Sequence, residues 1–153
     1  MIIRPVTAAD VRPLRRAVLR ANMADRTVVF DGDDDLGTIH LAAFDSDDQM
    51  IGSSTWLRRP CALEPGSRAV QLRGMATCTH LQSRGVGSAL LLAGFSLWVD
   101  EADIVWANAR DAALSFYERH GFETRGPGFI ETVTELPHHV VVRHLTPADR
   151  TAS

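Results

Sequence analysis

The sequence predicts an α+β (mixed α/β) fold, in which a mostly antiparallel sheet carries one parallel pair of strands. Three observations indicate this. Segments rich in β-formers occupy residues 38–77 and are separated by polar turns. An apolar run over residues 89–99, too long for one strand, then predicts a helix. Because this helix lies between the strand-like residues 68–77 and 103–108, it predicts a right-handed parallel crossover.

The first predicted elements are a short strand over residues 2–6 and an amphipathic helix that follows it. Thr7 or Asp10 offers a side chain that caps the helix N-terminus. Apolar residues then recur at helical spacing, and the arginines between them are expected on a solvated face. The apolar residues are Val11, Leu14, Val18 and Leu19, and the arginines are Arg12, Arg15, Arg16 and Arg20.

The middle of the chain predicts an antiparallel run of strands. Residues 38–44 and 50–57 are β-rich, and the polar turn between them favours a hairpin. Proline and glycine predict a loop over residues 58–67, and the strand over residues 68–77 follows it.

The last part of the chain alternates between strand and helix. The strand over residues 103–108 precedes a helix over residues 111–120. Two glycines around a proline predict a turn at residues 126–128, and residues 140–142 predict a last strand. The length of 153 residues suits one domain, expected over residues 1–145, with 146–153 as a disordered tail.

Composition excludes several classes of partner. The formal net charge is −3 and no long basic run occurs, which argues against a nucleic-acid partner. No apolar run reaches the ~20 residues of a membrane span, so no membrane partner is expected. The N-terminus lacks the order of a signal peptide, and a cytoplasmic location is expected. Cys61 and Cys78 are therefore expected to be reduced thiols.

No metal site is expected from the sequence. Acidic residues 31–35 partly match a calcium-binding EF-hand loop, but Leu36 stands where that loop needs glycine and Ala42 where it needs glutamate. A solvated acidic loop is expected instead. His138, His139 and His144 have no cysteine or carboxylate at ligand spacing.

Residues 82–89 form a glycine loop at the start of the long helix. Gly85 and Gly87 lack Cβ atoms, so the backbone can take positive φ and aim successive N–H groups at one ligand. The positive end of the helix dipole favours an anion there, which predicts a phosphate site. No lysine follows Gly87, which excludes the nucleotide P-loop. The dinucleotide fingerprint, which needs glycine at the position of Leu90, stays as an alternative.

Two motifs in this order resemble the GCN5-related N-acetyltransferases (GNAT). Gln82-x-x-Gly85-x-Gly87 is similar to their Q/R-x-x-G-x-G/A signature, and residues 112–122, preceded by Asn108, are similar to their N…A-x-x-F-Y-x-x-x-G-F segment. The resemblance implies the GNAT acyl-CoA N-acyltransferase fold, with helices on both faces, a splayed parallel pair of strands, and acetyl-CoA as acetyl donor. The implied cofactor-binding residues are Met75, Ala76, Thr77, Gln82, Ser83, Arg84, Gly85, Val86, Gly87, Ser88, Asn108, Ser115 and Tyr117.

The resemblance also implies catalytic residues. A tyrosine at the position of Tyr117 lies near the CoA sulfur in the family, where its phenol would protonate the leaving thiolate; the alternative is a core aromatic. Glu131 and His138 stand in a segment similar to one subset of these transferases. An imidazole at His138 would accept the proton of the amine, and the alternative is a histidine of a surface loop.

The implied function is an N-acetyltransferase that passes acetyl to a primary amine of a small molecule or peptide by direct attack. Two alternatives stay open: a non-catalytic CoA-binding sensor or interaction module, and a dinucleotide-binding enzyme. An exposed strand edge would allow a homodimer. The sequence does not identify the acceptor.

Overall fold

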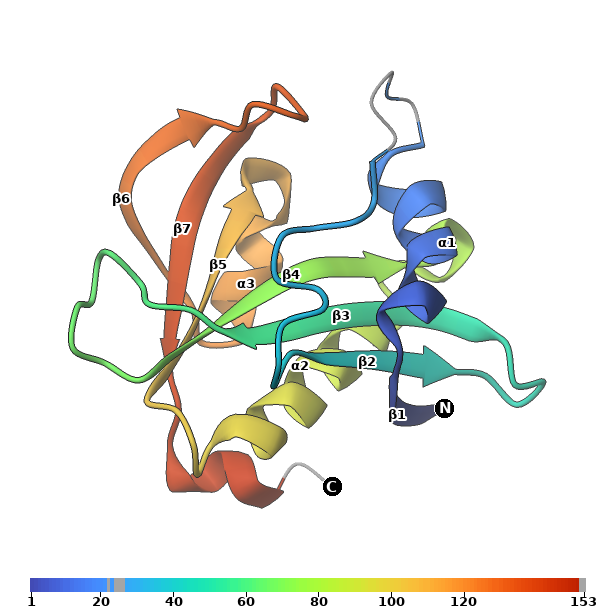
Figure 1. Ribbon diagram of the computed structural model, residues 1–153, viewed down its shortest axis with the longest axis horizontal. Coiled ribbons are helices and arrows are strands. Elements are labelled where there is room, and N and C mark those ends of the chain that lie inside the picture. The colour runs from blue at the N-terminus through green and yellow to red at the C-terminus, as the bar shows by residue number, and fades with distance from the viewer. Residues whose placement is uncertain (22, 24–26, 152–153) are drawn as a thin grey trace.

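The computed structural model describes residues 1–21, 23 and 27–151. It contains a seven-stranded sheet in the order β1-β2-β3-β4-β5-β7-β6 (Figure 1). β4 and β5 pair in parallel, and the other neighbours in this sheet pair antiparallel, which confirms the predicted fold class. The strands are β1 (Ile2–Val6), β2 (Ile39–Phe44), β3 (Met50–Arg58), β4 (Ala69–Thr77), β5 (Ile104–Arg110), β6 (Glu123–Ile130) and β7 (Pro137–His144).

Helices cover both faces of the sheet, as Figure 1 shows. The alternation of side chains along β3 shows which helix lies on which face of the sheet. Thr55 bonds to Arg15 of α1, whereas its neighbour Trp56 packs edge-on against Phe95 of α2. The main core lies on the α2 side, where α3 also packs. The helices are α1 (Ala8–Leu19), α2 (Val86–Trp98) and α3 (Leu114–Arg119), with short 3₁₀ helices η1 (Thr79–Leu81), η2 (Asp111–Ala113) and η3 (Pro147–Thr151).

Thr7, one of the two predicted caps, starts α1. Its hydroxyl accepts from the Asp10 N–H at 3.2 Å, and the Asp10 carboxylate accepts from the Thr7 N–H at 3.0 Å. This capping box satisfies donors at the helix start that would otherwise lack partners. It fixes where α1 begins, and therefore which of its residues face the sheet.

The parallel strands separate after a short contact. β4 and β5 pair only from Ala69 with Ile104 to Gln71 with Trp106. Beyond this point β4 stays on β3 as far as Thr77, and β5 stays on β7 as far as Arg110. Each strand therefore keeps one partner and turns its other edge toward a widening gap, which is visible between β4 and β5 in Figure 1. The expected splay is confirmed.

This sheet does not support a dinucleotide-binding fold. That fold needs a mostly parallel sheet and a small residue at the third position of its glycine fingerprint, where the first helix packs closely on a strand. Here one pair of neighbouring strands is parallel, and Leu90 occupies the third position with its side chain fully buried in the core.

The chain differs from the sequence prediction near its end. No turn interrupts residues 126–128, because β6 runs through them with an irregularity between Arg125 and Phe129. The last strand spans residues 137–144, longer than the predicted 140–142. The helix expected over residues 111–120 is divided into η2 and α3.

The expected disordered tail is wrong for residues 146–151. Asp149 is buried, and its carboxylate accepts from both terminal nitrogens of Arg143 at 3.0 Å and from the Thr146 N–H at 2.8 Å. These bonds join η3 to β7, a pairing across six residues that local composition does not reveal. Residues 152–153 lie outside the described residues.

Candidate active site

The gap between β4 and β5 opens into a cleft of about 1060 Å³. Its walls come from the end of α1, the loop at residues 27–31, β4, the glycine loop, β5, α3 and the β6–β7 connection. Twelve predicted site residues line it: Met75, Thr77, Gln82, Ser83, Gly85, Gly87, Ser88, Asn108, Ser115, Tyr117, Glu131 and His138. Segments distant in the sequence therefore meet at one place.

Three predicted cofactor residues do not line this cleft. Ala76 alternates into the core and is 2% exposed. Val86 is buried at the start of α2, where its side chain would collide with a Cβ placed at Gly52. Arg84 is exposed on the loop, away from the cleft lining. The side chains of all three therefore lie outside the cleft lining.

The glycine loop leaves backbone donors free at the start of α2. Gly85 has φ +90°, and a Cβ built on it would meet no atom within 4 Å. The first α-helical hydrogen bond returns from the Ala89 N–H to the Gly85 carbonyl at 3.0 Å. The N–H groups of residues 86–88 have no acceptor within the described chain, as expected for a first helical turn. Open space beside unpaired donors and the helix dipole suits a diphosphate.

Substitution at Gly85 tests this candidate diphosphate site, formed by the N–H groups of residues 86–88 and the open space at Gly85 and called here the diphosphate cradle. Gly85→Ala adds a methyl group in the space beside these donors, and we expect it to weaken acetyl-CoA binding about tenfold or more. The left-handed backbone also costs alanine about 1–2 kcal/mol.

Gly66→Ala is the matched control for this experiment. Gly66 has φ +91° and equally open surroundings, but it lies outside the cleft. We therefore expect a similar loss of stability with unchanged affinity, both measured by calorimetry. Equal affinities of the two variants for acetyl-CoA would contradict the assignment of the diphosphate to the N–H groups beside Gly85.

A β-bulge shapes β4 beside the gap. Between the pairs Ser53–Ala76 and Thr55–Arg73, β4 advances three residues while β3 advances two. Gly74 takes φ +60° at this point. The extra residue interrupts the ladder beside Met75, one of the implied cofactor-binding residues, and bulges commonly redirect the backbone at functional sites.

Arg15 supports this bulge from the α1 side. A Cβ at Gly74 would lie 2.9 Å from Arg15 Nε, so only glycine leaves room for the guanidinium. Arg15 is fully buried, which corrects the expectation of a solvated arginine face. It stands four residues after buried Val11, the spacing that places two side chains on the same face of a helix.

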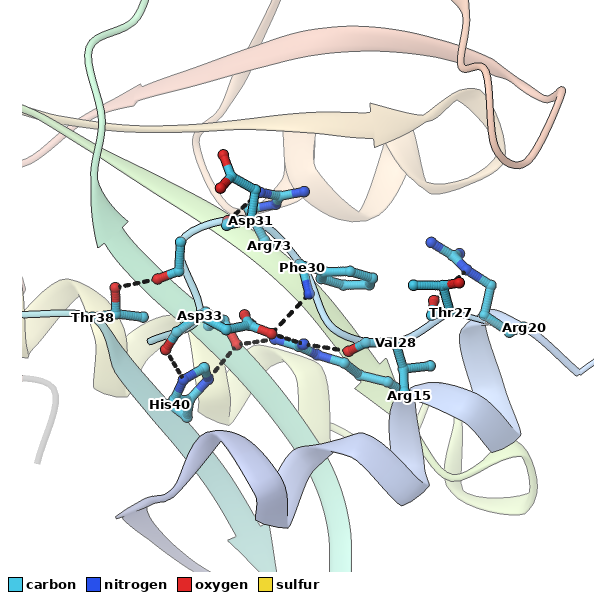
Figure 2. A network of polar contacts seen from close by, with 12 residues as sticks. Arg15, Arg20, Thr27, Val28, Phe30, Asp31, Asp33, Thr38, His40 and Arg73 are labelled. Carbon is cyan, nitrogen blue, oxygen red and sulfur yellow. Dashed lines mark hydrogen bonds and ion pairs between the residues drawn. The ribbon is translucent and has the colours of Figure 1, made fainter. Parts of the chain in front are cut away.

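The Arg15 guanidinium also holds the loop that covers the cleft (Figure 2). It donates to both carboxylate oxygens of Asp33 at 2.6 and 3.0 Å, and to the Val28 carbonyl at 2.8 Å. It lies 4.2 Å from the Phe30 ring centroid. The expected solvated acidic loop is therefore wrong at Asp33, which is 5% exposed. Phe30, anchored in this way, lines the cleft.

Tyr117 approaches the cleft from α3. It is 8% exposed, and its ring packs against Phe116 and Phe122, each with centroids 5.2 Å apart. Burial raises the pKa of its phenol to about 12. No hydrogen bond from its hydroxyl occurs within the described part of the chain. The side chain is both a core aromatic and a protonated donor at the cleft surface.

Tyr117 is the one tyrosine of the sequence, so its titration can be observed directly. We expect phenolate absorbance to rise near pH 12 in the folded protein and near pH ~10 after unfolding. Because the folded state keeps the proton longer, Tyr117 lowers stability as pH rises above ~10. If Tyr117 titrated at the same pH in the folded protein as in the unfolded protein, its phenol would be solvated in the folded state.

His138 is buried on β7, not placed on a surface loop. It is 6% exposed, and its ring stacks on Phe129 with centroids 5.8 Å apart. Nδ1 lies 2.8 Å from the Leu136 carbonyl. Because a carbonyl only accepts, this contact assigns the proton to Nδ1 and leaves the Nε2 lone pair available as a base.

Glu131 is engaged in the connection between β6 and β7. Its carboxylate accepts from the N–H groups of Thr134 at 2.6 Å and Val133 at 3.0 Å. Burial raises the pKa of this carboxyl, but the Thr134 and Val133 N–H groups outweigh it and leave the pKa lowered. A carboxylate stabilised in this way is a weak base, and its bonds shape the turn that carries His138.

Sequence reasoning missed Gln71, Arg110 and Phe30, which also line the cleft. The alternation along β4 could have indicated Gln71, because it stands two residues before Arg73 on the same face. Nothing local indicates Phe30, whose position depends on Arg15.

Neither a metal-binding cluster nor a membrane-spanning helix occurs among the described residues. No group of three or more His, Cys, Asp or Glu residues could hold a metal ion. None of the helices described has the length and apolar character needed to cross a lipid bilayer. Cys61 and Cys78 are both free thiols.

Comparison with known proteins gives a family match. The family model of the acetyltransferase (GNAT) domain matches residues 25–124. No significant match was found among curated proteins. Solved structures with similar folds include an aminoglycoside 6'-N-acetyltransferase complexed with coenzyme A (TM-score 0.74, 11% identity, 96% of this chain and 98% of that chain).

Two other similar structures cover nearly the whole chain. They are a GCN5-related N-acetyltransferase from Kribbella flavida (TM-score 0.71, 20% identity, 94% and 97% covered) and a ribosomal-protein-alanine N-acetyltransferase from Brucella melitensis (TM-score 0.70, 18% identity, 95% and 100% covered). At these identities they establish the fold alone. Since the family model covers roughly two thirds of the sequence, the chain belongs to the GNAT acetyltransferase family.

Proposed function

We propose that this protein transfers the acetyl group of acetyl-CoA to a primary amine by direct attack. The observation that carries the proposal is that the glycine loop, the gap between β4 and β5, Tyr117 and His138 share one cleft. Acetyl-CoA supplies an activated thioester. The residues of the chain must then hold it, admit an amine and move two protons.

The cleft residues suit these tasks. The free N–H groups at residues 86–88 and the open space at Gly85 would hold the diphosphate. Asn108 and Ser115 offer polar side chains along the gap for the pantetheine arm. Backbone amides near the bulge would stabilise negative charge on the acetyl oxygen.

The proton transfers have candidate donors and acceptors on opposite faces of the sheet. The amine nitrogen bonds to the acetyl carbon, the carbon–sulfur bond breaks, and the sulfur leaves with the bonding electron pair. His138 Nε2 accepts the proton that the amine loses, and the Tyr117 hydroxyl gives a proton to the thiolate. Glu131 is a positioning residue, because its carboxylate orders the turn before His138.

Two measurements test this function. Acetyl-CoA and CoA should raise the melting temperature, whereas NADPH should not. Release of free CoA thiol is then followed with a panel of polyamines, aminoglycosides, amino acids and peptides. The chain contains no lysine, so acetylation of its own lysines cannot imitate turnover.

Cofactor binding without thiol release for any amine would contradict the proposed transfer. It would favour the alternative of a CoA-binding sensor. Stabilisation by NADPH but not by acetyl-CoA would contradict the assignment of the cofactor as well.

A further inference from the structure

Polar side chains gather on the α1 face of the sheet beside the gap. Gln71 pairs with Trp106 at the last contact of β4 and β5, so these two residues share a face. Because every second residue of a strand lies on the same face, Arg73 on β4 shares the face of Gln71, and Asn108 and Arg110 on β5 share the face of Trp106. His138 is the cross-strand partner of Arg110 and shares its face. Gln71, Arg73, Asn108, Arg110 and His138 all line the cleft and are called here the acceptor face.

One end of the acceptor face is remote from the glycine loop. Thr77 ends β4 next to the glycine loop, and Gln71 lies six residues earlier on the same strand. At ~3.3 Å per residue this is roughly 20 Å. Gln71 therefore marks the closed end of the cleft, far from the glycine loop. Arg73 stands two residues beyond it on β4, and Arg110 stands four residues beyond its partner Trp106 on β5, so both guanidinium groups belong to the wider part of the gap.

The amide oxygen of Gln71 is buried and accepts no hydrogen bond from the described residues. The residue as a whole is 5% exposed. No hydrogen bond from its amide nitrogen to the described residues occurs either. A buried polar group without a partner is costly, and native structures rarely keep one without a use. Its place at the closed end of the gap suits a polar ligand.

Arg73 carries a charge that no carboxylate contacts. One of its nitrogens donates to the Asp31 carbonyl at 2.8 Å, and no ion pair to it occurs among the described residues. The Asp31 carboxylate lies by Arg59 at 3.3 Å, and Asp33 is held by Arg15. Burial, and then the charge of Arg59, lower the pKa of the Arg73 guanidinium, as expected where neutralisation is incomplete.

Arg110 lines the cleft from β5 and, like Arg73, has no carboxylate partner among the described residues. It donates to the Leu19 carbonyl at 3.2 Å, and the described chain places no carboxylate within ion-pair distance of it. Glu131, the acidic side chain nearest to His138 in the lining, already accepts two backbone N–H groups. The acceptor face thus presents guanidinium groups that an anionic ligand would neutralise.

We propose that the acceptor is a small amino acid, whose carboxylate is bound by Arg73 and Arg110 while the Gln71 amide contacts it at the closed end of the cleft. This inference rests on the proposed function. Guanidinium groups present forked donors that match a carboxylate. His138 on the same face would take the proton that the amino group loses. The amino acid gains the acetyl group on nitrogen, and CoA leaves as the free thiol.

The first experiment compares amino acids with their carboxamides, which keep the amine and lose the negative charge. We expect kcat/KM to favour the amino acid by about 10- to 100-fold. Arg73→Gln and Arg110→Gln should each reduce this ratio about tenfold or more, mainly through KM. Arg16→Gln is the matched control, because Arg16 is exposed on α1 outside the cleft, and it should leave the ratio unchanged.

The second experiment uses Gln71→Leu, which keeps the volume and removes the amide. Because the buried amide oxygen accepts no hydrogen bond from the described residues, we expect the melting temperature to rise by about 2–4 °C. The KM for the amino acid should rise about tenfold at the same time. A fall in melting temperature with unchanged KM would show that Gln71 has a structural role, and would overturn its part in the proposal.

Failure of this inference can be distinguished from failure of the proposed function. Equal kcat/KM for amino acids and carboxamides, with turnover of both, would overturn the amino-acid assignment and leave acetyl transfer intact. Calorimetric binding of acetyl-CoA without turnover of any amine would overturn acetyl transfer. Nuclear magnetic resonance of the CoA complex tests, without turnover, whether the acceptor face binds an amino acid. Binding to the unsubstituted protein that is lost in Arg73→Gln would support the inference. Absence of binding to the unsubstituted protein would overturn it.

Discussion

Tyr117→Phe is expected to lower kcat roughly 100-fold or more, because general acid catalysis typically contributes at least this factor. The phenol is buried, holds its proton up to a pKa of about 12, and lies at the cleft surface. Its hydroxyl has no hydrogen bond in the described chain, so its removal should not disturb the fold. The measurement is the steady-state rate of CoA release at saturating acetyl-CoA and acceptor.

Stability and affinity serve as controls for this variant. Phenylalanine keeps the ring contacts to Phe116 and Phe122, so the free energy of unfolding should change by less than about 1 kcal/mol. The dissociation constant of acetyl-CoA should stay within about twofold, because the ring that lines the cleft is retained. An unchanged kcat would mean that the thiolate leaves without help from Tyr117, and would remove this residue from the mechanism.

Arg15→Met is expected to lower the free energy of unfolding by about 3–5 kcal/mol, because it leaves the buried Asp33 carboxylate unpaired. Arg15 is fully buried and donates to Asp33, Val28 and Thr55. One substitution therefore releases the loop at residues 28–33 from α1 and β3 (Figure 2). Urea unfolding of both proteins measures the difference.

Two variants control the Arg15 experiment. Arg68→Met breaks the exposed pair with Asp103, whose side chains are 62% and 45% exposed, and should cost less than about 1 kcal/mol. The double variant Arg15→Met/Asp33→Leu removes both charges and should recover part of the loss. If Arg15→Met cost no more than Arg68→Met, the buried pair would not hold the loop.

The pH dependence of the Arg15 effect follows from Asp33. Burial raises the pKa of this carboxyl, but its bonds with Arg15 and the Phe30 N–H outweigh burial, and the folded pKa lies below 3.8. The unfolded chain therefore takes up the proton first as pH falls. This contribution to stability is complete above pH 3.8 and is lost as pH falls through the lower folded value. The difference between the unsubstituted protein and Arg15→Met should shrink accordingly in acid.

Much of the candidate site follows from local sequence. Gly85 and Gly87 before an apolar run determine a loop and a helix N-terminus, because backbone freedom and helical periodicity act over a few residues. The order of the glycine loop, Asn108 and Tyr117 along the chain predicted which segments meet. The structure brings these residues to one cleft.

Local patterns failed where direction depends on distant partners. Ala76 and Val86 stand inside correctly predicted segments, but their side chains point into the core. Periodicity alone does not say which face of β4 meets the gap, since both faces of a central strand are covered.

The tertiary structure decided which polar side chains are neutralised and which stay available. The sequence predicts that Arg15 and Asp149 are solvated, yet Arg15 is buried against Asp33 and Asp149 against Arg143. Gln71 resembles an ordinary strand residue in the sequence, yet its buried amide oxygen accepts no hydrogen bond from the described residues. Burial and pairing depend on how the elements pack against one another, which local sequence does not show. The sequence by itself therefore determined most of the elements and the glycine loop. Only the packing of those elements determined which charges of the acceptor face have no carboxylate partner among the described residues.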